Sequence, residues 1–332
     1  MTLHCLPEPV RCPAVSVEGA VHGDPNTQAF VAAATRHASA LPAAVRDAVL
    51  DFRSRSHRSG AGLVRGLPIG RVPRTPDTPT APTDKDRTSE RTLLAVASLL
   101  GEPVGYRPEL GGRLVQNIVP TRASSDRQVS TSSAVRLMFH TETAFHPYRP
   151  AYLLLLCLRG DAAASTTLAS IQEVIGDLPP AAVDVLFQPR FRIGIDESFL
   201  GGRDNVLGPP MPVLSGDRSN PTLVFDEDLM VGTDPEATAS LALLGQAVLR
   251  RHAHVTLEAG DLLIIDNARA VHGRSPYTPR FDGSDRWLQR TFVVQTLPTR
   301  PEDIDGRVIC TEFGALPAGL ASTPRPAAAL PL

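Results

Sequence analysis

The sequence is poor in several residue types whose absence narrows what the protein can be. Of its 332 residues only one, Lys85, is a lysine, so its 33 basic residues are almost all arginine. With 35 acidic residues the formal net charge is −2, and the chain lacks the basic surplus typical of proteins that bind nucleic acid. Arginine suits planar, two-point binding of carboxylates, although a bias in base composition explains the same usage.

Cysteines are also few, and long apolar runs are missing. The four cysteines show neither a C-x-x-C spacing nor a dense framework, which indicates reduced thiols in the cytosol. They are Cys5, Cys12, Cys157 and Cys310. No basic N-terminal region precedes an apolar core, and no apolar run approaches the ~20 residues that span a bilayer. We therefore expect a cytoplasmic protein whose partner is neither a nucleic acid nor a membrane; its oligomeric state is left open.

Hydrophobic periodicity predicts many short strands with helices before and between them. The expected helices cover residues 26–55 in two pieces, 88–101 with Thr88 or Ser89 as N-cap, 168–188 with a break at Pro179-Pro180, and 233–252. The expected strands cover residues 60–67, 113–119, 152–158, 190–195, 222–225, 255–257, 262–265 and 290–295. Residues 71–90 are dense in proline, threonine and charge, which is typical of a mobile loop. The pattern fits an α+β protein built on a barrel or jelly roll with helical additions.

A histidine and a glutamate lie two positions apart in the stretch FHTETAFH, residues 139–146, which reads as a strand. Residues i and i+2 of a strand point to the same face, so His140 and Glu142 are expected to project together. An imidazole and a carboxylate on one face are two of the three ligands of a facial triad for non-haem Fe(II). A strand-end pair that faces water gives the same pattern, so the interpretation requires a second, distant histidine.

His272 is the candidate for the third ligand. It lies far beyond Glu142 in the sequence and follows the expected buried strand Leu262–Ile265. The ligands would meet only through the fold, which suits a double-stranded β-helix, where strands distant in sequence face each other. Pro147 makes it doubtful that the first strand continues to His146, and two further histidines follow an expected helix end, where histidine commonly meets the helix dipole. The competing histidines are therefore His146, His252 and His254.

Two arginines follow His272 with an even spacing of four residues, Arg286 and Arg290. On a strand they would share one face, and two guanidinium groups inside an apolar barrel are costly unless anions pair with them. The carboxylates of a co-substrate and of a substrate would supply those anions. The alternative is a surface strand with solvated arginines, and the apolar run Thr291–Val294 disfavours that alternative for Arg290 more than for Arg286.

Three stretches together resemble the clavaminate synthase-like Fe(II)/2-oxoglutarate oxygenases. They are HTETAFH from residue 140, YLLLLCLRGD from residue 152 and DLLIIDNARAVHGRSPYTPRFDGSDRWLQRTFVV from residue 261. Within that group the chain is most similar to hydroxylases of free lysine, arginine or asparagine, and residues 196–200 and 224–230 resemble the lysine-hydroxylating branch. The resemblance covers roughly residues 90–295. One departure is Thr143, where the family more commonly has methionine or a similar apolar residue.

The resemblance implies how the iron and its co-substrate are held. His140, Glu142 and His272 would bind Fe(II), and Glu142 would also border the substrate. Arg286 would pair with the distal carboxylate of 2-oxoglutarate, with Thr167 in support. Thr167 also fits an ordinary polar residue of a strand, so its assignment has an alternative. The implied cofactor is Fe(II), with 2-oxoglutarate and O₂ as co-substrates.

The same resemblance implies a set of substrate contacts. Arg290 would take the α-carboxylate of an amino acid, together with Ser130, and Gln116 would contact its α-amine. Ser130 and Gln116 fit ordinary loop or strand residues equally well. Asp226 and Asp228 form another i, i+2 pair, which would either face a cationic side chain or make an ordinary acidic turn after a strand.

The expected function is hydroxylation of an unactivated sp³ carbon of a free L-amino acid, with L-lysine or L-arginine as the leading substrates and release of succinate and CO₂. The carboxylate at Glu142 favours hydroxylation over halogenation, because an alanine or glycine there would open a halide site. Alternatives are an oxygenase of the same type that acts on a neutral or carrier-bound amino acid, or one that desaturates or cyclises its substrate in natural-product biosynthesis. A non-catalytic β-barrel binding protein is an alternative of another class.

The expected organisation has three parts. Residues 1–90 form a helical N-terminal region with the mobile loop, packed on the core. Residues 91–300 form the double-stranded β-helix (jelly roll) core, with a helical insertion at about 168–255. Residues 301–332 form a C-terminal extension.

Overall fold

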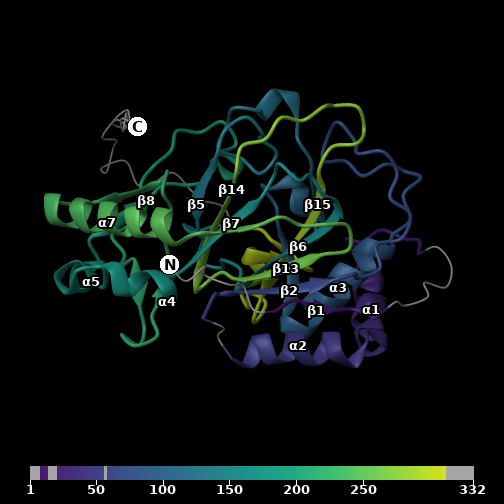
Figure 1. Cartoon of the computed structure of the whole chain (residues 1–332), viewed down its shortest axis with the longest axis horizontal. Coiled ribbons are helices and arrows are strands. Elements are labelled where there is room, and N and C mark those ends of the chain that lie inside the picture. The colour runs from purple at the N-terminus through teal and green to yellow at the C-terminus, as the bar shows by residue number, and fades with distance from the viewer. Residues whose placement is uncertain (1–7, 14–20, 56–57, 312–332) are drawn as a thin grey trace.

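Apolar residues gather in three clusters, which divide the protein into layers. The computed structural model describes residues 8–13, 21–55 and 58–311. A nine-stranded sheet and a four-stranded sheet both contribute to the middle cluster, and each sheet has a group of helices packed on its other side (Figure 1). This arrangement is possible because successive side chains of a strand point to opposite faces of the sheet, so one strand contributes residues to two clusters.

The longest apolar run of the sequence forms the centre of the larger sheet. Strand β6 (Tyr152–Arg159) lies between β13 (Leu262–Asp266) and β15 (Trp287–Val294) and pairs antiparallel with both. Leu153 and Leu155 point to the middle cluster, whereas Leu154 and Leu156 point to the helices. A strand buried on both faces needs apolar residues at successive positions, which is why this run lacks the usual alternation with polar residues.

The larger sheet has the strand order β1-β2-β13-β6-β15-β3-β17-β16, and β4 also pairs with β15. Its remaining strands are β1 (Val10–Arg11), β2 (Ala61–Arg65), β3 (Glu102–Tyr106), β4 (Gln116–Ile118), β16 (Ile304–Asp305) and β17 (Val308–Ile309). The smaller sheet has the order β12 (Ala253–Val255), β7 (Thr166–Ser170), β14 (Ala270–Arg274) and β5 (Leu137–His140). Two short pairs complete the set, namely β8 (Phe191–Ile193) with β11 (Met230–Gly232) and β9 (Leu214–Ser215) with β10 (Thr222–Leu223).

The helices form two groups on opposite sides of the strands (Figure 1). The group beside the larger sheet is α1 (Gln28–His37), α2 (Ala43–Ser54) and α3 (Thr88–Leu100), and the group beside the smaller sheet is α4 (Ile171–Val174), α5 (Pro180–Leu186) and α7 (Pro235–Arg251). A further short helix, α6 (Glu197–Leu200), precedes β9. Short 3-10 turns are η1 (Ala38–Ala40), η2 (Leu110–Gly112), η3 (Arg122–Ser124), η4 (Ile175–Asp177) and η5 (Pro301–Asp303). Among the described helices, none has the length and apolar character needed to cross a membrane.

The helix predictions are largely confirmed. Residues 26–55 form two helices, a helix ends at Gly101, and Pro179 precedes α5. The helix after Asp234 is also present, and its N-cap carboxylate accepts a hydrogen bond from the backbone of Ala237 at 3.0 Å. Gly101 has an extended backbone, and a side chain there would bring its Cβ within 2.4 Å of the Val294 carbonyl oxygen.

Several strand predictions are wrong in their bounds. The strand expected over 113–119 is limited to β4, and the strand expected over 255–257 is β12, which begins two residues earlier. In addition, residues 168–170 were expected to begin a helix but belong to β7. Strand β3 was not expected, because Pro103 and Gly105 break its pattern. The glycine is required by a close approach, since a Cβ at Gly105 would lie 2.1 Å from the Gly112 carbonyl oxygen.

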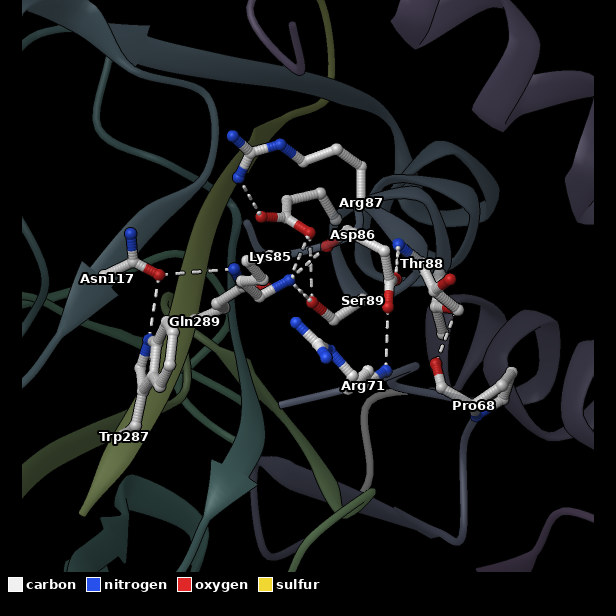
Figure 2. Close-up of polar contacts among 12 residues, drawn as sticks. Pro68, Arg71, Lys85, Asp86, Arg87, Thr88, Ser89, Asn117, Trp287 and Gln289 are labelled. Atoms are coloured by element: carbon white, nitrogen blue, oxygen red, sulfur yellow. Dashed lines mark hydrogen bonds and ion pairs between the residues drawn. The ribbon is translucent and has the colours of Figure 1, made fainter. Parts of the chain in front are cut away.

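The start of α3 differs from the predicted cap. Neither Thr88 nor Ser89 caps the helix; instead Asp86 accepts hydrogen bonds from the backbone N–H groups of Thr88 and Arg71, each at 2.8 Å. One carboxylate thus ties the helix to the segment that precedes it (Figure 2). An acidic side chain also suits the positive end of the helix dipole.

The only lysine of the chain lies inside this corner (Figure 2). The Lys85 ammonium donates to the carbonyl of Asp86 at 2.8 Å, the hydroxyl of Ser89 at 2.7 Å and a carboxylate oxygen of Glu90 at 2.7 Å. Its side chain is 0% exposed, and burial lowers its pKa although Glu90 opposes the change. Arg87 donates to the other oxygen of Glu90 at 3.1 Å. The three donors of an ammonium match these three acceptors, whereas a planar guanidinium would not.

We expect Lys85→Met to lower the free energy of unfolding by about 3 kcal/mol or more, because removing one partner of a buried ion pair leaves the other charge uncompensated. Urea unfolding followed by circular dichroism measures the change. Arg71→Met is the matched control: Arg71 forms an ion pair with Asp84 in which both side chains are exposed, so its loss costs less than about 1 kcal/mol. Equal effects of the two substitutions would contradict a special role for the buried lysine.

Candidate metal centre and its pocket

Two strands of the smaller sheet bring the separated ligand candidates together. His272 on β14 lies directly opposite His140 at the end of β5. Their ring centroids are 4.3 Å apart, and the Glu142 carboxylate oxygen Oε2 lies 3.3 Å from His272 Nε2 and 4.0 Å from His140 Nε2. One ligand atom from each of the three residues lies within 4.8 Å of the other two. The structure therefore places two imidazole nitrogens and one carboxylate oxygen around a common point.

Glu142 reaches this point from a turn and not from the predicted strand. Strand β5 ends at His140, and Thr143 has a φ of +46°, in the left-handed region that β-branched residues rarely adopt. The turn is held by Asn267, whose side chain accepts from the Glu142 N–H at 2.8 Å and donates to the Glu142 carbonyl at 3.1 Å. The expectation that His140 and Glu142 project together holds, but its stated reason, a continuous strand, is wrong.

The free atoms of the cluster suit a metal ion. Glu142 Oε2 and His272 Nδ1 are buried and have no hydrogen-bond partner among the described residues. His140 Nδ1 lies 2.9 Å from the Met138 carbonyl, to which only an N–H can donate, so the lone pair of the neutral ring is on Nε2, which faces the cluster. A buried carboxylate oxygen without a donor is expensive unless a cation meets it. Two nitrogens and one oxygen with open positions are the ligand set of non-haem Fe(II) sites.

The charge states of two ligands also fit metal binding. Burial alone would raise the pKa of Glu142, but Arg290 and the two histidines outweigh it and bring the pKa to about 2. Burial, followed by His140, lowers the pKa of His272 to about 4. A carboxylate and a neutral imidazole are the forms that bind a metal.

The competing histidines lie elsewhere. His146 is buried, and its Nδ1 accepts from the backbone N–H of Tyr148 at 2.9 Å; burial lowers its pKa to about 4. His252 and His254 contact each other near the helix end, with 3.0 Å between their Nε2 atoms. None of the three belongs to the cluster around Glu142.

A pocket opens at the cluster and is lined by many polar side chains. The predicted site residues that line it are His140, Glu142, His272, Arg286, Arg290, Ser130, Asp226 and Asp228. Gln116 is buried behind Arg290 and does not line the pocket. Residues that line it without having been predicted include Glu109, Thr166 and Asp196.

Arg286 has the environment of an anion site. Its side chain is buried, borders the pocket and forms no ion pair within the described part of the chain. Burial lowers its pKa from the usual value of arginine. Arg274 also lines the pocket, but its guanidinium is engaged by the carbonyls of Ser132 and Val135. Arg286 is therefore the guanidinium available for a carboxylate from outside the protein.

Thr167 does not share the pocket with Arg286. On β7, Leu168 lies opposite His272, and Thr166 lies opposite Arg274, so these positions belong to the face that carries the pocket. Thr167 lies opposite Gly273 and His254, on the other face. The predicted supporting hydroxyl, that of Thr167, therefore lies on the wrong face of β7, one residue from the position that faces the pocket. Thr166 lines the pocket, and its buried Oγ1 has no partner among the described residues.

Arg290 is placed as predicted, on the same face as Arg286, but the protein already supplies anions to it. Its guanidinium contacts a Glu109 carboxylate oxygen, lies 3.3 Å from Glu142 Oε1 and donates to the Gln116 side-chain oxygen at 2.6 Å and 3.0 Å. Burial lowers its pKa, but Glu109 and Glu142 more than offset this, so the pKa is raised. Glu109 follows a region without a clear pattern, and no signal in the sequence marked it.

The far side of the pocket is acidic. Asp226 lies opposite His140 in an isolated bridge and accepts from the backbone N–H groups of Asp228 and Leu229, so it both closes a turn and borders the pocket. Asp196 precedes α6, and burial, followed by Asp226 and Glu142, raises its pKa well above the usual value. The sequence around Asp196 resembles the lysine-hydroxylating branch, but this resemblance did not assign a role to Asp196.

Comparisons with known proteins agree with this geometry. The family described as Taurine catabolism dioxygenase TauD, TfdA family matches residues 214–292. L-lysine 3-hydroxylase of Catenulispora acidiphila is 37% identical over 86% of this chain and 81% of its own length, and L-asparagine oxygenase of Streptomyces coelicolor is 38% identical over 83% of each. The crystal structure of asparagine oxygenase in complex with Fe(II), 3-hydroxyasparagine and succinate matches with a TM-score of 0.81 and 35% identity, covering 88% of this chain and 92% of that one.

A facial cluster of two histidines and a glutamate, beside an unpaired buried arginine, defines the class of Fe(II)/2-oxoglutarate oxygenases. The chain belongs to the TauD/TfdA family of that class, and within it to the clavaminate synthase-like enzymes that include amino-acid hydroxylases.

We expect the wild-type protein to bind one equivalent of Mn(II), used as an air-stable stand-in for Fe(II), and His272→Ala to weaken this binding by more than about 100-fold. Losing a group that merely orients a ligand already costs about 10–100-fold, and His272 is itself a ligand candidate. Equilibrium dialysis with metal analysis provides the measurement. His254→Ala removes an exposed histidine outside the cluster and should bind Mn(II) as the wild type does. If His254→Ala lost metal binding and His272→Ala kept it, the metal site would lie at His254 and not at the proposed cluster.

Proposed function

We propose that the protein is an Fe(II)/2-oxoglutarate-dependent dioxygenase that hydroxylates an unactivated sp³ carbon of a free L-amino acid, with L-lysine or L-arginine as substrate. The observation that carries the proposal is a buried carboxylate oxygen without a donor, Glu142 Oε2, facing two imidazoles beside the unpaired guanidinium of Arg286. The relatives named for lysine and asparagine oxidation support the reaction type.

His140, Glu142 and His272 would hold the iron. Bound Fe(II) with 2-oxoglutarate supplies the oxidation, in which O₂ is consumed, 2-oxoglutarate becomes succinate and CO₂, and one oxygen atom enters the amino acid. Arg286 binds the distal carboxylate of 2-oxoglutarate, and the Thr166 hydroxyl, which borders the same pocket, replaces Thr167 as its support. The protein contributes positioning and the exclusion of water, which are large terms in such reactions.

The amino-acid head group is assigned to the region around Arg290. Arg290 and Ser130 take the α-carboxylate. Gln116 is less suited to the α-amine than expected, because its side-chain oxygen already accepts from Arg290 and its free atom, Nε2, is a donor. Glu109 Oε2 is a buried acceptor without a partner among the described residues, so we assign the α-amine to Glu109. Gln116 then acts by holding Arg290.

The preference for a basic side chain rests on the acidic wall. Asp196, Asp226 and Asp228 border the pocket, and burial raises the pKa of Asp196 and Asp226. Carboxyl groups gathered in this way are stabilised as anions by a cation among them. An ammonium or guanidinium group meets that need, whereas the neutral amide of asparagine does not.

The proposal also covers the type of fold and the cellular location of the protein. The two sheets that share the middle cluster are inferred to be the halves of a double-stranded β-helix, with α1 to α3 and the insertion at about 168–255 as helical additions. The larger sheet also takes β1, β2, β16 and β17 from outside the core predicted over residues 91–300. The free state of Cys12, Cys157 and Cys310 supports the proposed cytoplasmic location.

The experiment is a panel of L-amino acids incubated with the protein, Fe(II), 2-oxoglutarate and O₂, with mass spectrometry for the gain of one oxygen and an assay for succinate. Lysine or arginine should gain an oxygen in proportion to succinate. A product that has lost two hydrogens would identify a desaturase or cyclase. A panel without turnover, including asparagine and other neutral amino acids, would contradict hydroxylation of a free amino acid.

Glu142→Ala should abolish both succinate release and hydroxylation in this assay, because it removes the only acidic ligand of the cluster. Glu302→Ala removes an exposed carboxylate that does not line the pocket and is the matched control, which should retain most activity. A non-catalytic binding protein would show no succinate release in any variant. Unchanged turnover in Glu142→Ala would contradict the assignment of Glu142 as a metal ligand.

Asp226→Asn should raise KM for lysine or arginine by about 10-fold or more, since a charge-assisted hydrogen bond contributes about 1.5–3 kcal/mol. The amide oxygen can still accept from the backbone N–H groups that Asp226 now holds, so the turn is preserved. Asp217→Asn is the control, because Asp217 makes a similar turn contact with Ser219 on the exposed surface. A KM shift shared by both variants, or absent in Asp226→Asn, would refute the acidic-wall assignment.

A further inference from the structure

Residues 68–85 run along the beginning of β15 as an irregular segment, which we call the strap. We propose that the strap sets the position of Arg286 and that Thr75 is the positioning residue through which it does so. This inference rests on the proposed role of Arg286 in binding 2-oxoglutarate. It assigns a function to a segment that the sequence suggested was a mobile loop.

Thr75 fastens the strap to the residues just before Arg286. Its backbone N–H donates to the Gly283 carbonyl at 2.9 Å, and its hydroxyl donates to the Asp285 carbonyl at 2.6 Å. Thr75 is buried, although the other residues of the strap, apart from Lys85, are exposed or half-buried. The Asp285 carbonyl belongs to the peptide bond that leads directly into Arg286, so this contact fixes the backbone from which the guanidinium extends.

Other side chains hold the same contact in place. Arg159, at the end of β6, donates to the Thr75 hydroxyl and to the Pro73 carbonyl. Arg74 donates to the Asp282 carbonyl at 2.6 Å. The Thr75 hydroxyl therefore accepts from a guanidinium while it donates to Asp285, and both of its roles are used.

The strap is also tied to the residues just after Arg286. Asn117 on β4 accepts from the Trp287 indole at 2.9 Å and from the Gln289 amide at 3.2 Å (Figure 2). It also donates to the Pro79 carbonyl at 3.0 Å. At its two ends the strap is anchored to α3, by Thr92 at Pro68 and by the buried Lys85. The residues before Arg286 thus contact the strap directly, and those after it are linked to the strap through Asn117.

Arg286 needs this support because the sheet does not provide it. The residue lies before the first position of β15, and the register of β15 with β6 shifts between Trp287 and Leu288. A ladder with such an irregularity leaves local backbone groups to be fixed by other contacts. Arg286 also forms no ion pair within the described residues, so apart from a hydrogen bond with Tyr277 the direction of its side chain depends on its backbone. A displacement of about 1 Å in a positioning group can cost on the order of 100-fold.

The test is Thr75→Val, which keeps the shape of the side chain and removes the hydroxyl. Calorimetric titration of 2-oxoglutarate into the Mn(II)-loaded protein should show a Kd about 10-fold higher than in the wild type, and KM for 2-oxoglutarate should rise by a similar factor. We expect kcat at saturating 2-oxoglutarate and KM for the amino acid to stay within about 2-fold. Thr75→Ser, which restores the hydroxyl, should recover the affinity.

Thr92→Val is the control for a loss of stability alone. Thr92 is also buried and donates from its hydroxyl to a strap carbonyl, that of Pro68 at 2.8 Å, but this contact lies on α3, away from Arg286. It should lower the melting temperature to a similar extent and leave the affinity for 2-oxoglutarate unchanged. Equal weakening in both variants, or wild-type affinity in Thr75→Val, would overturn the proposal.

Two further variants separate the possible failures. If Arg286→Met binds 2-oxoglutarate as the wild type does, the proposed function of that arginine is wrong. If Arg286→Met loses binding while Thr75→Val does not, only the role of the strap is wrong. Should Thr75→Val not fold, Arg159→Met removes the guanidinium that holds the same hydroxyl and carries the same expectation of weakened 2-oxoglutarate binding.

Discussion

The structure of the site depends on one pairing, that of His272 with His140 across β14 and β5. Because these residues are far apart in sequence, the two imidazoles meet only through the pairing of these strands in the folded protein. Asn267 then holds the turn that brings Glu142 Oε2 between them. The resulting carboxylate oxygen is buried without a donor, which a folded protein tolerates where a cation completes the site.

Arg290 links the metal cluster to the substrate region. It lies between Glu109 and Glu142, with Gln116 behind it, so one guanidinium pairs with two buried carboxylates and leaves one negative charge over. Arg286, by contrast, lines the pocket without an ion pair among the described residues, and the acidic wall borders the same pocket. This buried guanidinium and the acidic wall match the two charged groups that 2-oxoglutarate and a basic amino acid would bring.

The sequence was informative where chemistry and spacing coincide. The ligand candidates could be predicted because a histidine and a glutamate two positions apart, with a second histidine far away, match the ligand set of non-haem Fe(II). Strand alternation was not the correct reason, since β5 ends at His140 and Arg286 precedes β15. Thr167 was misplaced because it adjoins Thr166, and a shift of one residue reverses the face. The turn at Thr143 was missed because its conformation is imposed by Asn267, which lies far away in sequence. Glu109 and Thr75 were missed for the same reason, since their partners lie on β15 or just before it.

The central claim is that this protein divides molecular oxygen between 2-oxoglutarate and an amino acid. Its most direct test is a reaction under ¹⁸O₂ with the preferred substrate, followed by mass spectrometry of both products. The account predicts one labelled oxygen in succinate and one in the hydroxylated amino acid. Formation of an unlabelled hydroxyl group by addition of water, with 2-oxoglutarate left intact, would contradict it.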